Sequence, residues 1–158
     1  MTAGAELREE VGELYFDYVE AIVNGAIDLW PTFFDEQCVY KLISKENHES
    51  GLPLALIFCD SQGMLKDRVF ASMKLNVYAP RVWRYSLGRV RAEERPDGQI
   101  AGSATFAIFE TLTGQSTRIL CTGRYLDKLI RVGGRLKFRE RLCVYDTTLV
   151  PGSIVFPV

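Results

Sequence analysis

The stretch IAGSATFAIFETLT, residues Ile100–Thr113, decides the fold class of this sequence. Its apolar residues Ala104, Phe106 and Ile108 alternate with smaller or polar neighbours. A period of two is typical of a β-strand with one buried face, whereas a helix places its apolar residues three and four positions apart. The stretch therefore predicts a long strand that contributes one face to the core.

Three further strands are predicted on either side of this one. They cover Trp83–Glu94, Ser116–Val132 and Arg135–Leu149, and they are separated by turn signals such as Asp97-Gly98 and Gly133-Gly134. The four strands are expected to form an antiparallel meander. Because they exceed the usual five or six residues, the sheet should bend strongly, with kinks expected at Gly88, Gly102 and Gly123.

Alternation also predicts which side chains of the last two strands face the core. The inward set is Ile119, Cys121, Gly123, Tyr125, Leu136, Phe138, Leu142 and Val144. The outward set includes the basic residues Arg118, Arg124, Lys137, Arg139 and Arg141. This division predicts a sheet with an apolar inner face and a polar outer face.

The N-terminal half has the helical period instead. Apolar residues recur every three or four positions from Leu7 to Ile22, and Asn24-Gly25 supplies a stop. The remaining predicted elements are a helix over Ile27–Phe34, a strand over Val39–Ile43, and a helix from a cap at Asp60 or Ser61 to about Tyr78, with Leu65, Val69 and Met73 inward. Residues 1–158 are thus predicted to form one α+β domain in which N-terminal helices cover a curved antiparallel sheet.

Composition and charge exclude several classes of function. The chain has 158 residues, of which 47% are hydrophobic and 25% charged, and its formal net charge is -1. This balance offers no basic field for nucleic acid. The first residues are acidic where a secretory signal is basic, and the longest apolar run, Leu52–Cys59, is too short to span a bilayer. We expect a cytoplasmic protein that binds neither nucleic acid nor membrane.

The chain has a single histidine, His48, and this count limits its metal chemistry. A Rieske centre needs two histidines and two cysteines, and a facial-triad iron site needs two histidines and a carboxylate. Neither site can be built from this chain, so no metal or cofactor is expected in it. The cysteines Cys38, Cys59, Cys121 and Cys143 form no CxxC pair and are expected to be buried apolar side chains.

Three classes of function remain open from the residues alone. A self-contained isomerase or dehydratase would need only a buried carboxylate base and a tyrosine. Its candidates are Asp28, Asp35, Tyr40, Asp60 and Tyr125. A ligand-binding module would need no such base. The cluster Arg81, Trp83, Arg84 and Tyr85 combines residue types enriched at protein interfaces, which favours an interface or a buried network.

Several stretches resemble the small, or beta, subunit of aromatic-ring-hydroxylating dioxygenases. They are WPTFFDEQCVY (Trp30–Tyr40), NHESGL (Asn47–Leu52), DSQGMLKDRV (Asp60–Val69), PRVWRY (Pro80–Tyr85) and CVYDT (Cys143–Thr147). The pair Asp67-Arg68 is the most distinctive part. The resemblance implies a cone-shaped fold like that of nuclear transport factor two, also called cystatin-like.

The resemblance also implies a role in a larger assembly. In that family the small subunit has no catalytic residues and braces a large, or alpha, oxygenase subunit, which holds a Rieske cluster and a mononuclear non-haem iron. A separate reductase supplies electrons, and the expected assembly is a trimer of alpha–beta pairs in which small subunits also associate with one another. The interface residues implied for this chain are Asn47, His48, Asp67, Arg68, Arg81, Trp83, Arg84 and Tyr85.

Two details refine this resemblance. Tyr85 departs from it, because many members have a histidine at that place after the arginine. The short connection from Tyr40 to Asp60 is similar to that of small subunits whose large partners act on aromatic carboxylic acids such as salicylate or terephthalate. The resemblance does not fix the aromatic substrate itself.

Overall fold

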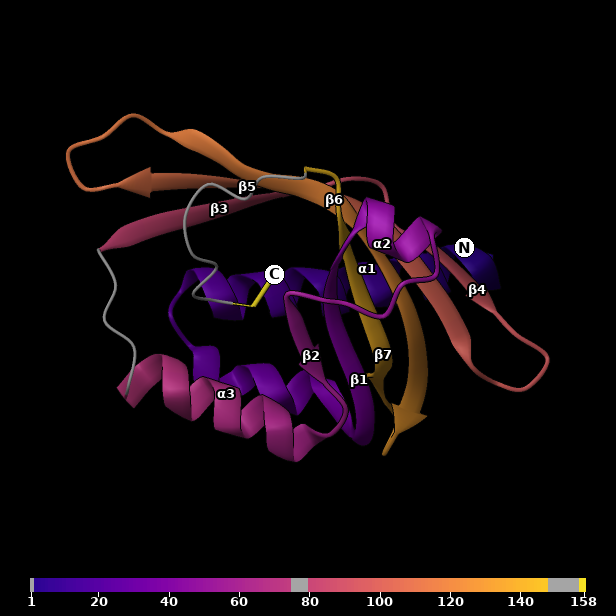
Figure 1. Ribbon diagram of the computed structural model, residues 1–158. Helices are drawn as coiled ribbons and strands as arrows, with labels where there is room; N and C mark the ends of the chain where they lie inside the picture. Colours follow the sequence, from indigo (N-terminus) through magenta and orange to yellow (C-terminus); the bar gives the residue numbers. More distant parts are fainter. Residues whose placement is uncertain (1, 75–79, 148–156) are drawn as a thin grey trace.

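The computed structural model describes residues 2–74, 80–147 and 157–158, and it has helices packed inside a strongly bent sheet (Figure 1). The helices are α1 (Ala3–Val23), the 3-10 helix η1 (Ile27–Phe33), α2 (Lys45–Glu49) and α3 (Gln62–Lys74). The strands are β1 (Phe34–Ser44), β2 (Ile57–Cys59), β3 (Arg81–Leu87), β4 (Arg91–Glu94), β5 (Ile100–Leu112), β6 (Arg118–Val132) and β7 (Arg135–Tyr145). The predicted α+β class is confirmed.

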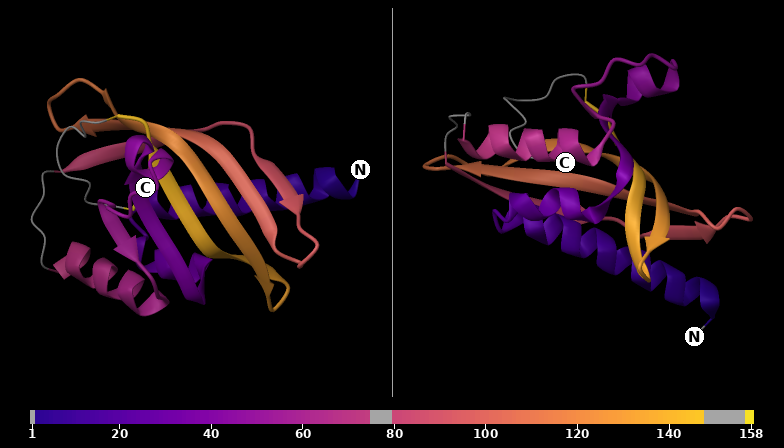
Figure 2. Two further views of the ribbon diagram at one scale, coloured as in Figure 1. Left: turned by 45° about the vertical axis from the view of Figure 1, so that its right-hand side comes forward. Right: turned by 90° about the horizontal axis from the view of Figure 1, so that it is seen from below.

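Helix α1 crosses the inner face of the sheet, as the views in Figure 2 show. Its buried residues, Val11, Tyr15, Tyr18, Ala21 and Ile22, fall on the face that the sequence period predicts. The helix ends at the expected stop, where Gly25 adopts a positive φ of 75° that other residues rarely adopt. The helix therefore places two tyrosines deep in the interior.

Helix α3 begins where its prediction placed the cap, at Ser61. The Ser61 hydroxyl caps it by accepting a hydrogen bond from the Met64 N–H at 3.2 Å. Leu65 and Val69 are buried as predicted, but Met73 is 55% exposed, so its predicted inward place is wrong. The described helix ends at Lys74, and the predicted continuation to Tyr78 lies outside the described residues.

The sheet has the order β2-β1-β7-β6-β5-β3, with β4 paired to β5. The predicted antiparallel meander is confirmed for β5, β6 and β7. The first predicted strand is divided into β3 and β4, and the break contains Gly88, where a Cβ would collide with Thr105. Strand β1 pairs with β7 in parallel, which was not predicted and makes the sheet mixed.

A first bulge lies in the pairing of β5 with β6. Ile108 pairs with Cys121, but the next residue, Phe109, pairs with Ile119, so Leu120 has no opposite partner. Leu120 and Cys121 are both buried, and Ile119 is 59% exposed. The predicted inward place of Ile119 is therefore wrong.

A second bulge lies in the pairing of β6 with β7. Lys128 pairs with Glu140, whereas the next residue, Leu129, pairs with Phe138. The alternation of β7 changes phase at this point, because an extra residue exchanges the two faces of a strand. Arg141 consequently faces the core and is fully buried, whereas Leu142 faces outward, which reverses the prediction for both residues.

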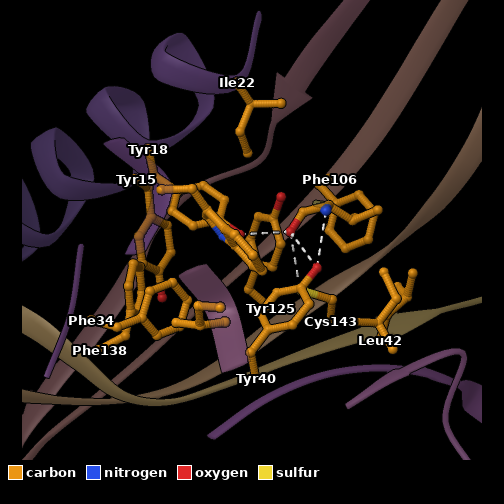
Figure 3. Close-up of a cluster of buried hydrophobic side chains, with 14 of the residues drawn as sticks. Tyr15, Tyr18, Ile22, Phe34, Tyr40, Leu42, Phe106, Tyr125, Phe138 and Cys143 are labelled. Carbon is orange, nitrogen blue, oxygen red and sulfur yellow. Dashed lines mark hydrogen bonds between the residues drawn. The ribbon is translucent and has the colours of Figure 1, made fainter. Parts of the chain in front are cut away.

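Aromatic side chains from α1, β1, β5, β6 and β7 fill the interior, as Figure 3 shows. All four cysteines are buried and free, as predicted. Gly123 allows close packing here, since a Cβ at this position would collide with the Val144 carbonyl oxygen and the Phe106 ring. Gly123 therefore lets the backbones of β6 and β7 approach closely, and neither of the two bulges lies at this residue.

Candidate functional site

The centre of the interior holds a buried ion pair that the sequence did not predict. Arg141 Nη2 lies 3.4 Å from Asp127 Oδ2, and both side chains are 0% exposed. The guanidinium carbon of Arg141 lies 3.6 Å from the centroid of the Tyr125 ring and 4.2 Å from that of Tyr18. A delocalised cation between aromatic faces is a favourable arrangement. Arg141 is thus held by rings and by one carboxylate.

The burial of this pair perturbs its carboxylate. Loss of water raises the pKa of Asp127 from 3.8 to about 6, although the charge of Arg141 acts in the opposite direction. The nitrogens of Arg141 and the hydroxyl of Tyr125 make no hydrogen bond among the residues that the structure describes. A carboxylate with a raised pKa beside tyrosines is a chemically competent base, but solvent does not reach this one.

Pro157 and Val158 are buried, and the main-chain oxygen of Val158 lies beside the side chains of Tyr40 and Cys143. The main-chain oxygen of Val158 accepts hydrogen bonds from the hydroxyls of Tyr18 at 2.9 Å and Tyr40 at 3.2 Å. The Val158 N–H donates to the Tyr40 hydroxyl at 3.0 Å. The cone therefore has its interior filled by its own side chains and by these two residues.

The residues proposed for an isomerase or dehydratase do not meet. Tyr40 and Tyr125 are buried in the core, but Asp28 and Asp60 are exposed on the surface. Asp35 is bound by Arg139 in an ion pair of 3.1 Å. The carboxylate that does lie beside the tyrosines, Asp127, was missed, although its position two residues after Tyr125 places it on the predicted inward face of the strand.

A second buried carboxylate, Glu110, binds side chains of the arginine-rich segment Arg81–Tyr85 at the start of β3. It accepts hydrogen bonds from Trp83 Nε1 at 2.8 Å and Arg81 Nη1 at 3.1 Å, and from Arg118 Nη2 at 2.6 Å. Burial raises the pKa of Glu110, but the hydrogen bonds from Trp83 and Arg118 and the charge of Arg81 together hold it below its ordinary value. Arg81 and Trp83 therefore belong to a buried network within the chain.

The other two candidate residues of the segment Arg81–Tyr85, Arg84 and Tyr85, have different surroundings. Arg84 is exposed on β3. The half-buried Tyr85 donates a hydrogen bond from its hydroxyl to the Pro157 carbonyl oxygen at 3.0 Å. The structure thus leaves Arg84 available on the surface and ties Tyr85 to the interior.

Asn47 and His48 lie in the short helix α2, between the predicted strand at Val39–Ile43 and the helix that follows Ser61. Ser44 caps this helix, since its hydroxyl oxygen accepts a hydrogen bond from the Asn47 N–H at 3.1 Å. The Asn47 side chain donates to the Leu54 carbonyl oxygen at 3.0 Å and so fixes the segment that follows. Both Asn47 and His48 are half-buried.

A row of apolar side chains beside α2 is exposed to solvent. Leu52 is 53%, Leu54 74%, Leu56 57% and Phe58 47% exposed. They alternate with the buried Ile57 and Cys59 as the chain enters β2, which is the edge strand of the sheet. We call these four residues the leucine row. A continuous apolar run does not show from sequence alone which of its side chains another layer covers, so this row was missed.

Asp67 and Arg68 lie on helix α3, whereas the residues of the Glu110 network lie on the strands of the sheet. Asp67 is exposed, and Arg68 is half-buried with an Nε atom that has no hydrogen-bond partner among the described residues. The eight residues expected at an interface are thus distributed over α2, α3 and β3, and they do not form one cluster.

The outer face of the sheet carries a groove of about 800 Å³. Side chains from β4, β5, β6 and β7 line it, among them Arg91, Ser103, Leu126, Lys128, Glu140 and Leu142. Its lining mixes charges of both signs with small and apolar residues. Within residues 2–74, 80–147 and 157–158, no group of three His, Cys, Asp or Glu side chains is placed to hold a metal ion.

Comparisons of the sequence and of the fold with known proteins lead to the same family. The sequence profile of the family described as "Ring hydroxylating beta subunit" matches residues 19–151. The chain belongs to this family. Its family resemblance and its fold like that of nuclear transport factor two are thereby confirmed.

Curated relatives of this beta subunit include two dioxygenase subunits. The terminal oxygenase component subunit beta 1 of terephthalate 1,2-dioxygenase from Comamonas sp is 30% identical over 141 residues, which cover 89% of this chain and 92% of the relative. The small subunit of anthranilate 1,2-dioxygenase from Burkholderia cepacia is 27% identical over 149 residues, which cover 94% and 92%.

Solved structures agree with this assignment. A beta subunit described as that of an aromatic-ring-hydroxylating dioxygenase from Novosphingobium aromaticivorans superposes with a TM-score of 0.88, at 30% identity and 98% coverage of both chains. A naphthalene 1,2-dioxygenase chain reaches 0.75 at 16% identity, covering 94% of this chain and 83% of that one, and so shows the fold alone. No helix among the described residues is long and apolar enough to cross a membrane.

Proposed function

We propose that this beta subunit has no catalytic centre of its own and braces large, or alpha, oxygenase subunits. In this proposal the large subunit holds a Rieske cluster and a mononuclear non-haem iron, and a reductase delivers electrons to the complex. The names of the relatives support it, since one is a subunit of a terminal oxygenase component. The single histidine also supports it, because it cannot supply the ligands of either centre.

The leucine row is the observation that carries the proposal. Four large apolar side chains exposed within one seven-residue segment are unusual on a protein that works alone. Complete burial of a fully exposed side chain of this size is worth about 1.5–3 kcal/mol, and each of these half-exposed residues would gain roughly half of that. The row lies at the open edge of the sheet, and the hydrogen bond from Asn47 holds its centre in place. We assign the large subunit as the partner that covers it.

The candidate interface residues take two roles in this proposal. Asn47 and His48 lie beside the leucine row and contact the large subunit together with it, and the exposed Asp67 and Arg84 and the half-buried Arg68 add polar contacts at the edge of the interface. Arg81, Trp83 and Tyr85 act within the chain, where they hold β3 in the position that presents Arg84.

Self-association as a trimer also belongs to this proposal. The groove on the outer face of the sheet has arginine and lysine opposite glutamate and leucine, a mixture that suits contact with a second copy of the same chain. Three alpha–beta pairs would then share one threefold axis. We place the assembly in the cytoplasm.

The names of the relatives support an aromatic carboxylic acid as the substrate of the large partner. Terephthalate and anthranilate, which appear in the names of the two curated relatives, are both aromatic carboxylic acids. We infer a substrate of this class, with terephthalate or salicylate as the first compounds to assay. The substrate pocket itself would lie in the large subunit.

Co-purification with a large oxygenase subunit tests the proposal. The isolated chain should be colourless and inactive, and the complex should contain iron and hydroxylate an aromatic acid. Leu54→Asp should weaken the complex by at least about 2 kcal/mol, because a carboxylate would be buried without a partner. Val132→Asp, at another exposed apolar residue, is the matched control and should leave the affinity unchanged.

Two outcomes would contradict the proposal. Equal loss of affinity in both variants would show that the leucine row is not the contact surface. Isomerase or dehydratase turnover by the isolated chain, abolished by Asp127→Asn, would instead establish the alternative function.

A further inference from the structure

Pro157 and Val158 lie inside the cone as a ligand would. Both residues are buried, and Val158 is 0% exposed. Their hydrogen-bond partners come from four different elements, which are α1, β1, β3 and β7. Two residues that bind four elements at the centre of a fold occupy a site that was built around their chemistry.

The main-chain oxygen of Val158 has an unusual set of donors. It accepts from the Tyr18 hydroxyl at 2.9 Å, the Tyr40 hydroxyl at 3.2 Å and the Cys143 thiol at 3.3 Å. Three donors around one oxygen are typical of a site for a carbonyl or carboxylate. The guanidinium of Arg141, 4.2 Å from the centroid of the Tyr18 ring, adds positive potential to this region.

The other features of the site suit an apolar ligand with a hydrogen-bond donor. The Tyr40 hydroxyl accepts the Val158 N–H at 3.0 Å, so an amide fits as well as an acid. Val158 belongs to the same buried apolar cluster as Phe106 and Leu42, which supply apolar surface to the site. The site thus pairs one polar end with an apolar body.

We propose that the seat of Pro157 and Val158 is a binding site for a small carboxylic acid or amide with an apolar body. In the structure the chain itself fills this site. An external ligand must displace a segment that is covalently tethered beside its seat, so the intact chain should bind such a ligand weakly. The proposal does not depend on the large subunit, because every contact that carries it lies within this chain.

A shortened chain gives the direct test. A variant that ends at Phe156 lacks both occupying residues, and the tripeptide Phe-Pro-Val, which copies residues 156–158, is the probe. The tripeptide should bind the shortened chain with a saturable, one-to-one isotherm and should bind the intact chain at least ten times more weakly. Absence of saturable binding to the folded, shortened chain at millimolar peptide would overturn the proposal.

The thiol of Cys143 reports the occupancy of the site. It donates to the Val158 oxygen, and burial raises its pKa to about 12, so it should react slowly with iodoacetamide while the site is filled. Shortening the chain should accelerate its alkylation at least tenfold, and the tripeptide should reverse the effect. Cys38 and Cys59, which are buried on β1 and β2, are internal controls whose rates should not change.

Two further variants cover the case in which the shortened chain does not fold. Val158→Gly in the full chain removes the side chain and keeps the main-chain hydrogen bonds, and it should accelerate alkylation of Cys143 about threefold or more. Benzoate should slow that reaction again, and the added substitution Tyr40→Phe should weaken the benzoate effect. Unchanged alkylation in Val158→Gly, or no protection by benzoate, would overturn the proposal.

Discussion

Asp127 and Arg141 face each other across β6 and β7 at 3.4 Å, and neither side chain touches solvent. Both residues lie directly opposite in the register of the two strands. Aromatic rings surround the arginine, which is the only buried side chain of its type among the described residues. The stability of the sheet therefore depends on a pair of opposite charges at its centre.

Replacing only the arginine should be costly. Arg141→Met would leave the Asp127 carboxylate buried without its cation, and we expect the free energy of unfolding to fall by about 3–5 kcal/mol. Urea denaturation at pH 7 measures this loss. The added substitution Asp127→Asn should recover most of it, because the uncompensated charge is then gone. A loss below about 1 kcal/mol in the single variant would contradict the expectation.

The pair should also give the protein a distinctive pH dependence. The pKa of Asp127 is raised from 3.8 to about 6 in the folded state, so the native state binds a proton more tightly than the unfolded chain does. Its contribution to stability is therefore full below about pH 4 and is lost as the pH rises through 6. The free energy of unfolding of the natural chain, relative to that of Asp127→Asn, should fall by up to about 3 kcal/mol between pH 4 and 7.

Comparison with Asp127→Asn removes the contributions of groups that both proteins share, including Glu110. That carboxyl has a lowered pKa and acts in the opposite direction, stabilising the fold at higher pH. A difference between the two proteins that stays constant from pH 4 to 7 would show that Asp127 does not titrate in this range.

The backbone at Gly123 should tolerate no side chain. A methyl group there would collide with the Val144 carbonyl oxygen of the neighbouring strand, which cannot move without breaking the ladder. We expect Gly123→Ala to lower the free energy of unfolding by about 3 kcal/mol or more. Gly63→Ala is the matched control, since its new methyl group would have only ordinary contacts within α3. Thermal unfolding should show little change or a slight gain for the control.

Asn47 should matter more for assembly than for folding. Asn47→Ala removes the hydrogen bond to the Leu54 carbonyl oxygen, which is exposed, so we expect the free energy of unfolding to change by less than about 1 kcal/mol. The leucine row would become less ordered, and binding to the large subunit should weaken at least threefold. Titration calorimetry of the two purified subunits measures this. His48→Ala tests whether the neighbouring ring contributes equally.

Sequence reasoning predicted the parts of the fold that depend on local order. The period of Ala104, Phe106 and Ile108 identified β5 and its inward face correctly. Gly25 and the two glycines of the last hairpin adopt positive φ where turns were predicted. Each of these features is determined by residues a few positions apart, and such signals can be read along the chain.

The features that escaped prediction depend on partners distant in the chain. Strict alternation placed Leu142 inward and Arg141 outward, but the extra residue Arg139 in the bulge of β7 changes the phase just before them. The leucine row escaped for another reason, because exposed leucines have the same pattern as buried ones until the opposing layer is known. The candidate site could therefore be identified only from the three-dimensional structure.

The parallel pairing of β1 with β7 has a consequence for how the chain is made. Tyr40 pairs with Arg141, so β1 leaves the ribosome roughly a hundred residues before its partner exists. At about 5–20 residues per second, that delay is about 5–20 seconds. The nascent β1 meanwhile has an open edge and, with β2, exposes the leucine row to solvent. Hairpins of the meander form quickly by comparison, so docking of β1 onto β7 should be the last step of folding. The time to this step should determine how long the nascent chain needs a chaperone.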